Sequence, residues 1–113
     1  MQTWAKSSGP ERYPIFVEQG AGGTMITCGC QAGAMGQMCK HKVALIEGDA
    51  SFAVSGHEAG WQEACEAVQA SGIPTAYAAF IEEQDAIEKQ MEVLKKQAKA
   101  SKGMFARRLS EGL

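Results

Sequence analysis

Three cysteines and one histidine fall within fourteen residues, as Cys28-Gly29-Cys30 and Cys39-Lys40-His41. Thiolates and imidazoles are the usual ligands of zinc in tetrahedral structural sites. Residues two apart in an extended strand point to the same side, so Cys28 and Cys30 can present both sulfurs to one ion. On a regular helix Cys39 and His41 would diverge by roughly 200°, so we expect Cys39 just before a helix and His41 in its first turn. The pattern predicts one structural Zn²⁺ bound by Cys28, Cys30, Cys39 and His41.

Other chemistry fits these residues less well. A Cys-x-Cys disulfide would close a very short, strained loop, and pairing across the motif would leave His41 unexplained. A site with four protein ligands is closed, whereas catalytic zinc usually keeps an open position for water. His57-Glu58 is not followed by the second histidine of a zincin motif, and the chain has no glycine-rich phosphate loop. We therefore expect no catalytic residues and a protein that is not an enzyme.

The elements around the ligands are expected to be a β-hairpin and a short helix. Residues 13–18 and 24–27 alternate like strands, and the glycines between them suit a tight turn. Residues 31–37 are expected to form a loop, and residues 40–46 a short helix that stops at Gly48-Asp49. Residues 1–12 are interpreted as a polar N-terminal arm. The zinc-binding module would then span residues 13–48.

Residues 49–113 are predicted to be a helical segment. A first helix is expected at about 56–70, with Trp61, Cys65 and Val68 on one face. A long helix is expected at about 75–100, because apolar residues recur there at three- and four-residue steps from Tyr77 to Ala98. This stripe is either an intramolecular packing face or the interface of a homodimer through residues 77–98. The fold class is α+β: a zinc-stabilised hairpin and short helix (ββα), followed by two helices and a basic C-terminal tail.

Charge is distributed very unevenly along the chain. Residues 1–42 carry a net +2, residues 43–88 a net −9, and residues 89–113 a net +5, which together give −2. An anionic partner would meet the C-terminal part, and a cationic partner the middle. Candidate contacts with nucleic-acid phosphates are the basic residues next to the ligands and near the C-terminus: Lys40, Lys42, Lys102, Arg107 and Arg108. Local charge compensation at the metal site and a solvated helix end explain the same residues without a partner.

The ligand pattern resembles that of the SWIM-type zinc finger, C-x-C followed by C-x-H. The similarity extends to Tyr13-Pro-Ile-Phe-Val, to Gly22 through Cys30 and to Gly36 through Leu45, and covers about residues 13–48. It implies a ββα zinc fold with the four ligands named above. SWIM modules are credited with binding DNA or proteins, and occur with helicase or transposase domains that this chain lacks.

Together these features predict a zinc-binding recognition module that binds nucleic acid, DNA rather than RNA. The alternative is a protein–protein adaptor or inhibitor that acts through the helical stripe or the acidic middle segment. No signal peptide or membrane-spanning run is visible, so we expect no membrane association and a cytoplasmic protein, or a nuclear one in a eukaryote. In a reducing compartment clustered cysteines favour metal binding over disulfides.

Overall fold

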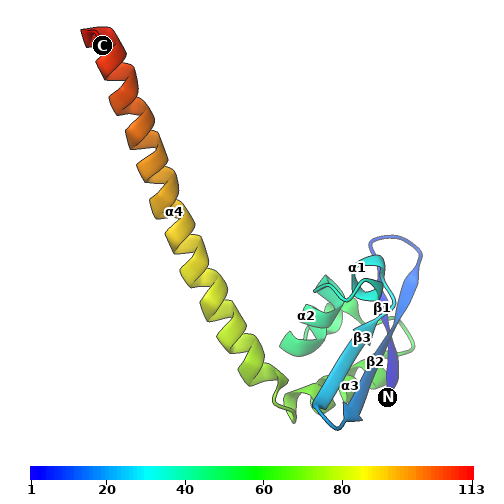
Figure 1. Cartoon of the computed structure of the whole chain (residues 1–113). Coiled ribbons are helices and arrows are strands. Elements are labelled where there is room, and N and C mark those ends of the chain that lie inside the picture. Colours follow the sequence, from blue (N-terminus) through cyan, green and yellow to red (C-terminus); the bar gives the residue numbers. More distant parts are fainter. The chain divides into compact units, whose positions relative to one another are not determined.

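The computed structural model describes all 113 residues of the chain, which form two compact units, Met1–Tyr77 and Ala78–Leu113. We call them the N-terminal and C-terminal units. The fold is α+β, as predicted: an antiparallel sheet is followed by helices, of which the last is long (Figure 1). No helix is long and apolar enough to span a membrane.

A three-stranded meander forms the sheet, in the order β1 (Gln2–Lys6), β2 (Arg12–Gly20) and β3 (Gly23–Cys28). Side chains alternate between the two faces, so Ile15 and Val17 of β2 are buried while Phe16 between them is exposed. Gly20 pairs with Gly23 across the β2–β3 turn, where Gly23 has a φ of 120° that side-chain-bearing residues rarely adopt. The predicted hairpin is therefore confirmed.

The interpretation of residues 1–12 as a polar arm is wrong. Residues 2–6 form strand β1, which pairs with β2 from Gln2 opposite Phe16 to Lys6 opposite Arg12. The buried side chains of β1 are Thr3 and Ala5, at 2% and 0% exposure. Threonine and alanine are small and only weakly hydrophobic, so their alternation gave little sign of a strand that is buried on one face.

Helices cover one face of this sheet. Helix α2 (Lys40–Glu47) contacts β3, and α3 (Glu58–Gln69) contacts β1 and β2 (Figure 1). The two helices also contact each other, and the short 3₁₀ helix η1 (Ala50–Phe52) lies between them in sequence. The largest fully buried side chains are Trp61, Ile15, Leu45 and Val68. Because α3 supplies Trp61 and Val68, the N-terminal unit includes residues beyond 48 in its core.

The remaining helices differ from the predictions at their ends. Residues 31–34, predicted to be loop, form the single-turn helix α1 (Gln31–Ala34). The last helix, α4, runs from Ile73 to Glu111, so the predicted basic C-terminal tail is helical. Gly103 does not stop it, because one glycine costs a helix only about 1 kcal/mol. Helix α4 ends before Gly112, which has a φ of 101°.

Candidate metal centre

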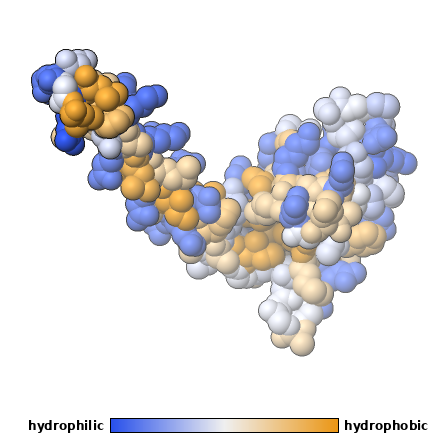
Figure 2. Space-filling model, turned by 45° about the horizontal axis from the view of Figure 1, so that its top comes forward, coloured by the Kyte–Doolittle hydropathy of each residue, from blue (hydrophilic) through white to orange (hydrophobic).

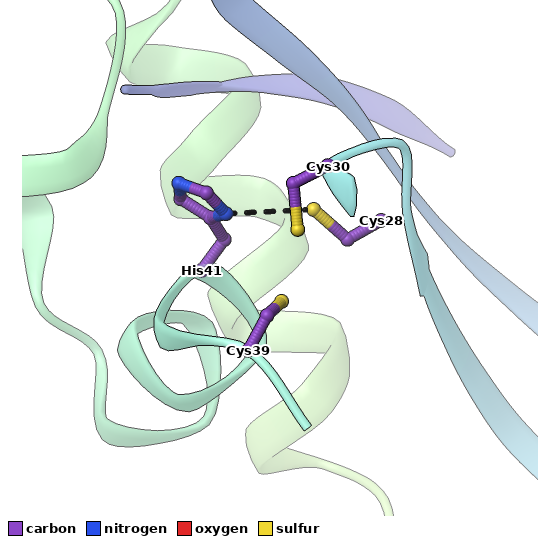
Figure 3. Close-up of side chains that lie close together, drawn as sticks. All are labelled: Cys28, Cys30, Cys39 and His41. Atoms are coloured by element: carbon purple, nitrogen blue, oxygen red, sulfur yellow. Dashed lines mark hydrogen bonds between the residues drawn. The ribbon is translucent and has the colours of Figure 1, made fainter. Parts of the chain in front are cut away.

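Four side chains converge where β3 ends and α2 begins (Figure 3). Cys28 is the last residue of β3 and Cys30 caps the N-terminus of α1, while Cys39 caps the N-terminus of α2 and His41 lies in its first turn. Their ligand atoms all lie within 4.8 Å of one another. In a tetrahedral site with metal–sulfur bonds of about 2.3 Å, neighbouring sulfurs lie about 3.8 Å apart. The four residues are therefore positioned to bind one metal ion.

This site is shielded from water. The exposed fraction is 3% for His41 and 5–8% for the three cysteines, and no disulfide joins them. The fourth cysteine, Cys65, lies buried on α3, on the face that also carries Trp61 and Val68, as predicted. Three buried thiolates without a cation would repel one another in a low-dielectric setting, so the donor set fits a divalent metal ion, whose charge offsets most of theirs.

The histidine ring is held in the orientation and tautomer that a metal requires. Nε2 of His41 lies 3.1 Å from the carbonyl oxygen of Lys6, and Nδ1 lies 3.6 Å from Sγ of Cys28. A carbonyl oxygen only accepts hydrogen bonds, so Nε2 carries the proton and Nδ1 directs its lone pair toward the sulfurs. Such a partner for the second ring nitrogen is typical of metal-binding histidines. Strand β1, which supplies Lys6, is thus part of the site.

Aromatic rings complete the pocket around His41. Its ring centroid lies 5.6 Å from that of Tyr13 on β2 and 5.8 Å from that of Phe52, which meets it edge-on. Burial lowers the pKa of His41 against the opposing effect of the Lys6 carbonyl. The imidazole is therefore neutral near pH 7, which is the form that binds metal.

The cysteines differ in the environment of their sulfurs. Burial, reinforced by the nearby Cys30 and Cys39 sulfurs, raises the pKa of Cys28 to about 12, although the backbone N–H of Cys30 acts in the opposite direction. Burial acts to raise the pKa of Cys30. Hydrogen bonds to its sulfur, of which the one from the Gly33 N–H has the largest effect, outweigh burial, so the pKa of Cys30 is lowered. A metal ion must therefore displace the proton of Cys28, while Cys30 is closer to the thiolate form.

Two backbone N–H groups point at the sulfurs from the ends of the helices. The N–H of Gly33 donates to Sγ of Cys30 at 3.3 Å, and that of Lys42 donates to Sγ of Cys39 at 3.4 Å. Helix N-termini stabilise thiolates because they present free N–H groups and the positive end of the dipole. Gly33 is also required sterically, since a Cβ at this position would lie 2.8 Å from Cβ of Cys28 and closer still to its carbonyl oxygen.

The predicted basic contacts divide into two sets. Lys40 is exposed beside the ligands, whereas Nζ of Lys42 donates to the carbonyl oxygen of Gln37 at 3.3 Å. Lys102, Arg107 and Arg108 lie on α4. At about 100° per residue their side chains leave the helix in three directions, roughly 100–140° apart. They do not form a single basic face.

The fold and the four ligands together define a small α+β protein with a closed Cys₃His site for one metal ion. Comparison of the chain with protein-family models, with curated proteins and with solved structures found no match.

We predict that Cys30→Ser abolishes stoichiometric metal binding, because a serine hydroxyl is a poor zinc ligand at neutral pH. Elemental analysis of the purified protein should find about one metal ion per native chain and almost none in the variant. Cys65→Ser is the matched control, since it removes a buried thiol that lies outside the cluster. Equal metal content in all three proteins would show that these cysteines are not ligands.

We further predict that Gly33→Ala weakens metal binding at least tenfold, since the new methyl group would displace Cys28. The affinity can be measured by competition with a chromogenic chelator. Gly22→Ala is the control, because a Cβ at Gly22 would meet nothing within 4 Å. If the two variants bind equally well, the close approach of Gly33 to Cys28 has no role in the site.

A third prediction concerns strand β1. Ala5→Glu places a carboxylate at a position with 0% exposure and should detach β1 from the sheet, while Gln2→Glu adds the same group at an exposed position of the strand. We expect Ala5→Glu, but not Gln2→Glu, to lower metal affinity about 10- to 100-fold, although neither removes a ligand.

The role of His41 in that effect can be separated by a double-mutant cycle. His41→Cys provides a thiolate that needs no hydrogen-bond acceptor at Lys6. If β1 acts by orienting the imidazole, the loss caused by Ala5→Glu should shrink in the His41→Cys background. The same loss in both backgrounds would mean that β1 supports the fold and not the histidine.

Proposed function

We propose that this protein is a SWIM-type zinc-binding recognition module that binds nucleic acid, with DNA preferred over RNA. Zinc is favoured by the Cys₃His donor set, by ligand atoms that all lie within 4.8 Å of one another, and by the burial of the four residues. The SWIM assignment rests on the C-x-C and C-x-H spacing and on the placement of these pairs at the end of a strand and the start of a helix. We also propose that the protein is not an enzyme, because a four-ligand site leaves no position for substrate or water.

One observation supports nucleic-acid binding above the others. Two of the four basic residues of the N-terminal unit lie beside the metal site, in the first turn of α2. Lys40 and Lys42 flank His41 in sequence. Lys6 contributes its backbone carbonyl, while its side chain and that of its register partner Arg12 belong to the face of the sheet opposite Ala5 and Tyr13. Of the seven acidic residues in this unit, only Glu11 lies in the same region. The others are on the far part of β2, at or just beyond the C-terminal end of α2, or on α3.

The surface beside the ligands is also suited to a bound chain. A hollow of about 580 Å³ opens onto the site itself, and three of the ligands line it together with polar and aromatic neighbours: Cys30, Cys39, His41, Ser7, Tyr13 and Lys40. Cations positioned with aromatic rings are the usual means of holding phosphates and stacked bases.

The metal site requires reduced thiols, so we place the protein in the cytoplasm, or in the nucleus of a eukaryotic host.

A protein–protein adaptor or inhibitor is the second candidate. It is favoured by the large apolar side chains exposed along α4, and the acidic residues between 43 and 88 provide a surface for a basic protein. In that case the N-terminal unit would show no salt-dependent affinity for nucleic acid.

The proposal predicts that the affinity for a generic DNA duplex falls linearly with salt on a double-logarithmic plot. Lys40→Glu combined with Lys42→Glu should weaken binding by about tenfold or more and reduce the slope by about 2. Fluorescence anisotropy with labelled DNA and RNA across a salt series measures both quantities. Lys40→Glu alone should have the larger single effect, because Nζ of Lys42 is already bonded to Gln37.

Lys89→Glu, a charge reversal in the C-terminal unit, is the matched control and should change little. Zinc content must be the same in all variants. Salt-independent or undetectable binding by the native protein would reject the proposal, and the adaptor function would then be preferred.

A further inference from the structure

Helix α4 carries an apolar stripe whose flanking charges specify what can bind it. No side chain of α4 is buried, and Met91, Leu94 and Phe105 are 52–61% exposed. Figure 2 shows hydrophobic residues along the visible face of the long helix, with hydrophilic residues on both sides and a further hydrophobic cluster near its end. Tyr77, the first residue of the predicted stripe, packs against the core of the N-terminal unit instead. The exposed stripe therefore begins at Phe80.

We infer that two copies of this chain associate through residues 80–105 of α4 as an antiparallel coiled coil. From Phe80 to Phe105 the apolar stripe alternates steps of four and three residues, which is the spacing of the contact line between two helices of a coiled coil. We call this line of residues the seam. The partner that covers the stripe is thus helix α4 of a second copy of the chain. The orientation follows from charge, and the register follows from the residues along the seam.

Charge on the two halves of the stripe is opposite and equal. Residues 82–92 contain five acidic residues and one lysine, a net −4, and residues 93–103 contain four lysines and no acidic residue, a net +4. A parallel pair would place −4 beside −4 and +4 beside +4. An antiparallel pair places each acidic segment against a basic one.

The dipole of α4 alone does not account for this arrangement. Charge–dipole effects fall off within the first and last turn of a helix. The acidic segment begins at residue 82, more than two turns after the helix starts at Ile73, and the lysines end well before Glu111. These charges therefore fit interaction with a partner better than interaction with the ends of their own helix.

In one antiparallel register every seam residue faces a residue of the same polarity in the second copy. With Met91 opposite Leu94 of the second copy, apolar residues face apolar ones and polar residues face polar ones. The further layers are Ile87 opposite Ala98, Gln84 opposite Ser101, and Phe80 opposite Phe105. Each layer occurs twice because the dimer is two-fold symmetric.

Shifting by one heptad in either direction breaks this match. One shift sets Gln84 against Leu94, and the other sets Met91 against Ser101 and Phe80 against Gly112. A polar group facing an apolar one in a seam is left without a hydrogen-bond partner. The sequence thus favours one register.

The residues beside the seam agree with the same register. Glu88 lies between the Ile87 and Met91 layers and faces Lys95 of the second copy, which lies between the same two layers. In a parallel pair Glu88 would instead face Glu83 of the second copy, at the g position of the preceding heptad. Glu88 is therefore attracted to the second copy in the antiparallel dimer and repelled by it in a parallel one.

The first test is the mass of the zinc-loaded full-length chain by sedimentation equilibrium from micromolar to several hundred micromolar concentration. The expected result is a reversible association to twice the 12.0 kDa of the chain. A monomer over the whole range, or a defined assembly of any other size, would overturn the inference.

The second test uses charge reversals that leave the fold intact, with helicity followed by circular dichroism. Glu88→Lys creates two Lys–Lys contacts in the antiparallel dimer and should raise its dissociation constant about tenfold at low salt. Lys95→Glu should do the same. Mixing the two variants, or combining both substitutions in one chain, should restore dimerisation because every Glu–Lys contact is regained.

Glu82→Lys is the matched control, since it makes the same change of charge on the side of α4 away from the seam. It should alter the dissociation constant far less than Glu88→Lys. Tighter association of Glu88→Lys would indicate a parallel dimer and refute the inference, as would failure of the mixture to restore the dimer. None of these outcomes depends on nucleic-acid binding.

Discussion

The hydrogen bond between Nε2 of His41 and the carbonyl oxygen of Lys6 links strand β1 to the first turn of helix α2. It joins residues 35 positions apart, and the rest of the site depends on it, because it determines which imidazole nitrogen is available for metal. The Lys6 carbonyl is in place only when β1 pairs with β2, and β1 stays in place only when Thr3 and Ala5 are covered. Formation of the sheet, burial of β1 and orientation of the ligand are therefore one cooperative event.

The metal site also completes a small core. Three of the buried residues that form the continuous core cluster are the ligand cysteines themselves, which belong to the same cluster as Ile15 and Leu45. A chain segment of this size buries too little apolar surface to be very stable without a further cross-link. A metal ion that joins the end of β3 to the start of α2 supplies one at the point where the sheet meets the helices.

Much of this arrangement could be predicted from local sequence signals. The four ligands were found from their spacing, the hairpin from its glycines, and the long helix from its three- and four-residue periodicity. Strand β1 was missed because Thr3 and Ala5 are buried by contacts with residues distant in sequence, which periodicity does not reveal. The role of Lys6 was missed for a related reason: its contribution is a backbone carbonyl, which every residue possesses, and only the tertiary fold selects this one. The extension of α4 through residue 111 was missed because the apolar periodicity was followed only to Ala98, and the basic residues beyond it were interpreted as a tail.

The position of Lys6 has a consequence for the rate at which the bound ion is exchanged. Release of a bound ion requires a first metal–ligand bond to break, and His41 is the only one of the four ligands without a negative charge. Its departure requires the imidazole to rotate, which the Lys6 carbonyl and the rings of Tyr13 and Phe52 oppose. Fraying of β1, an edge strand at one side of the sheet, removes the first of these restraints. Opening of β1 would therefore shorten the lifetime of a bound ion, although this strand contributes no side chain to the ligand set.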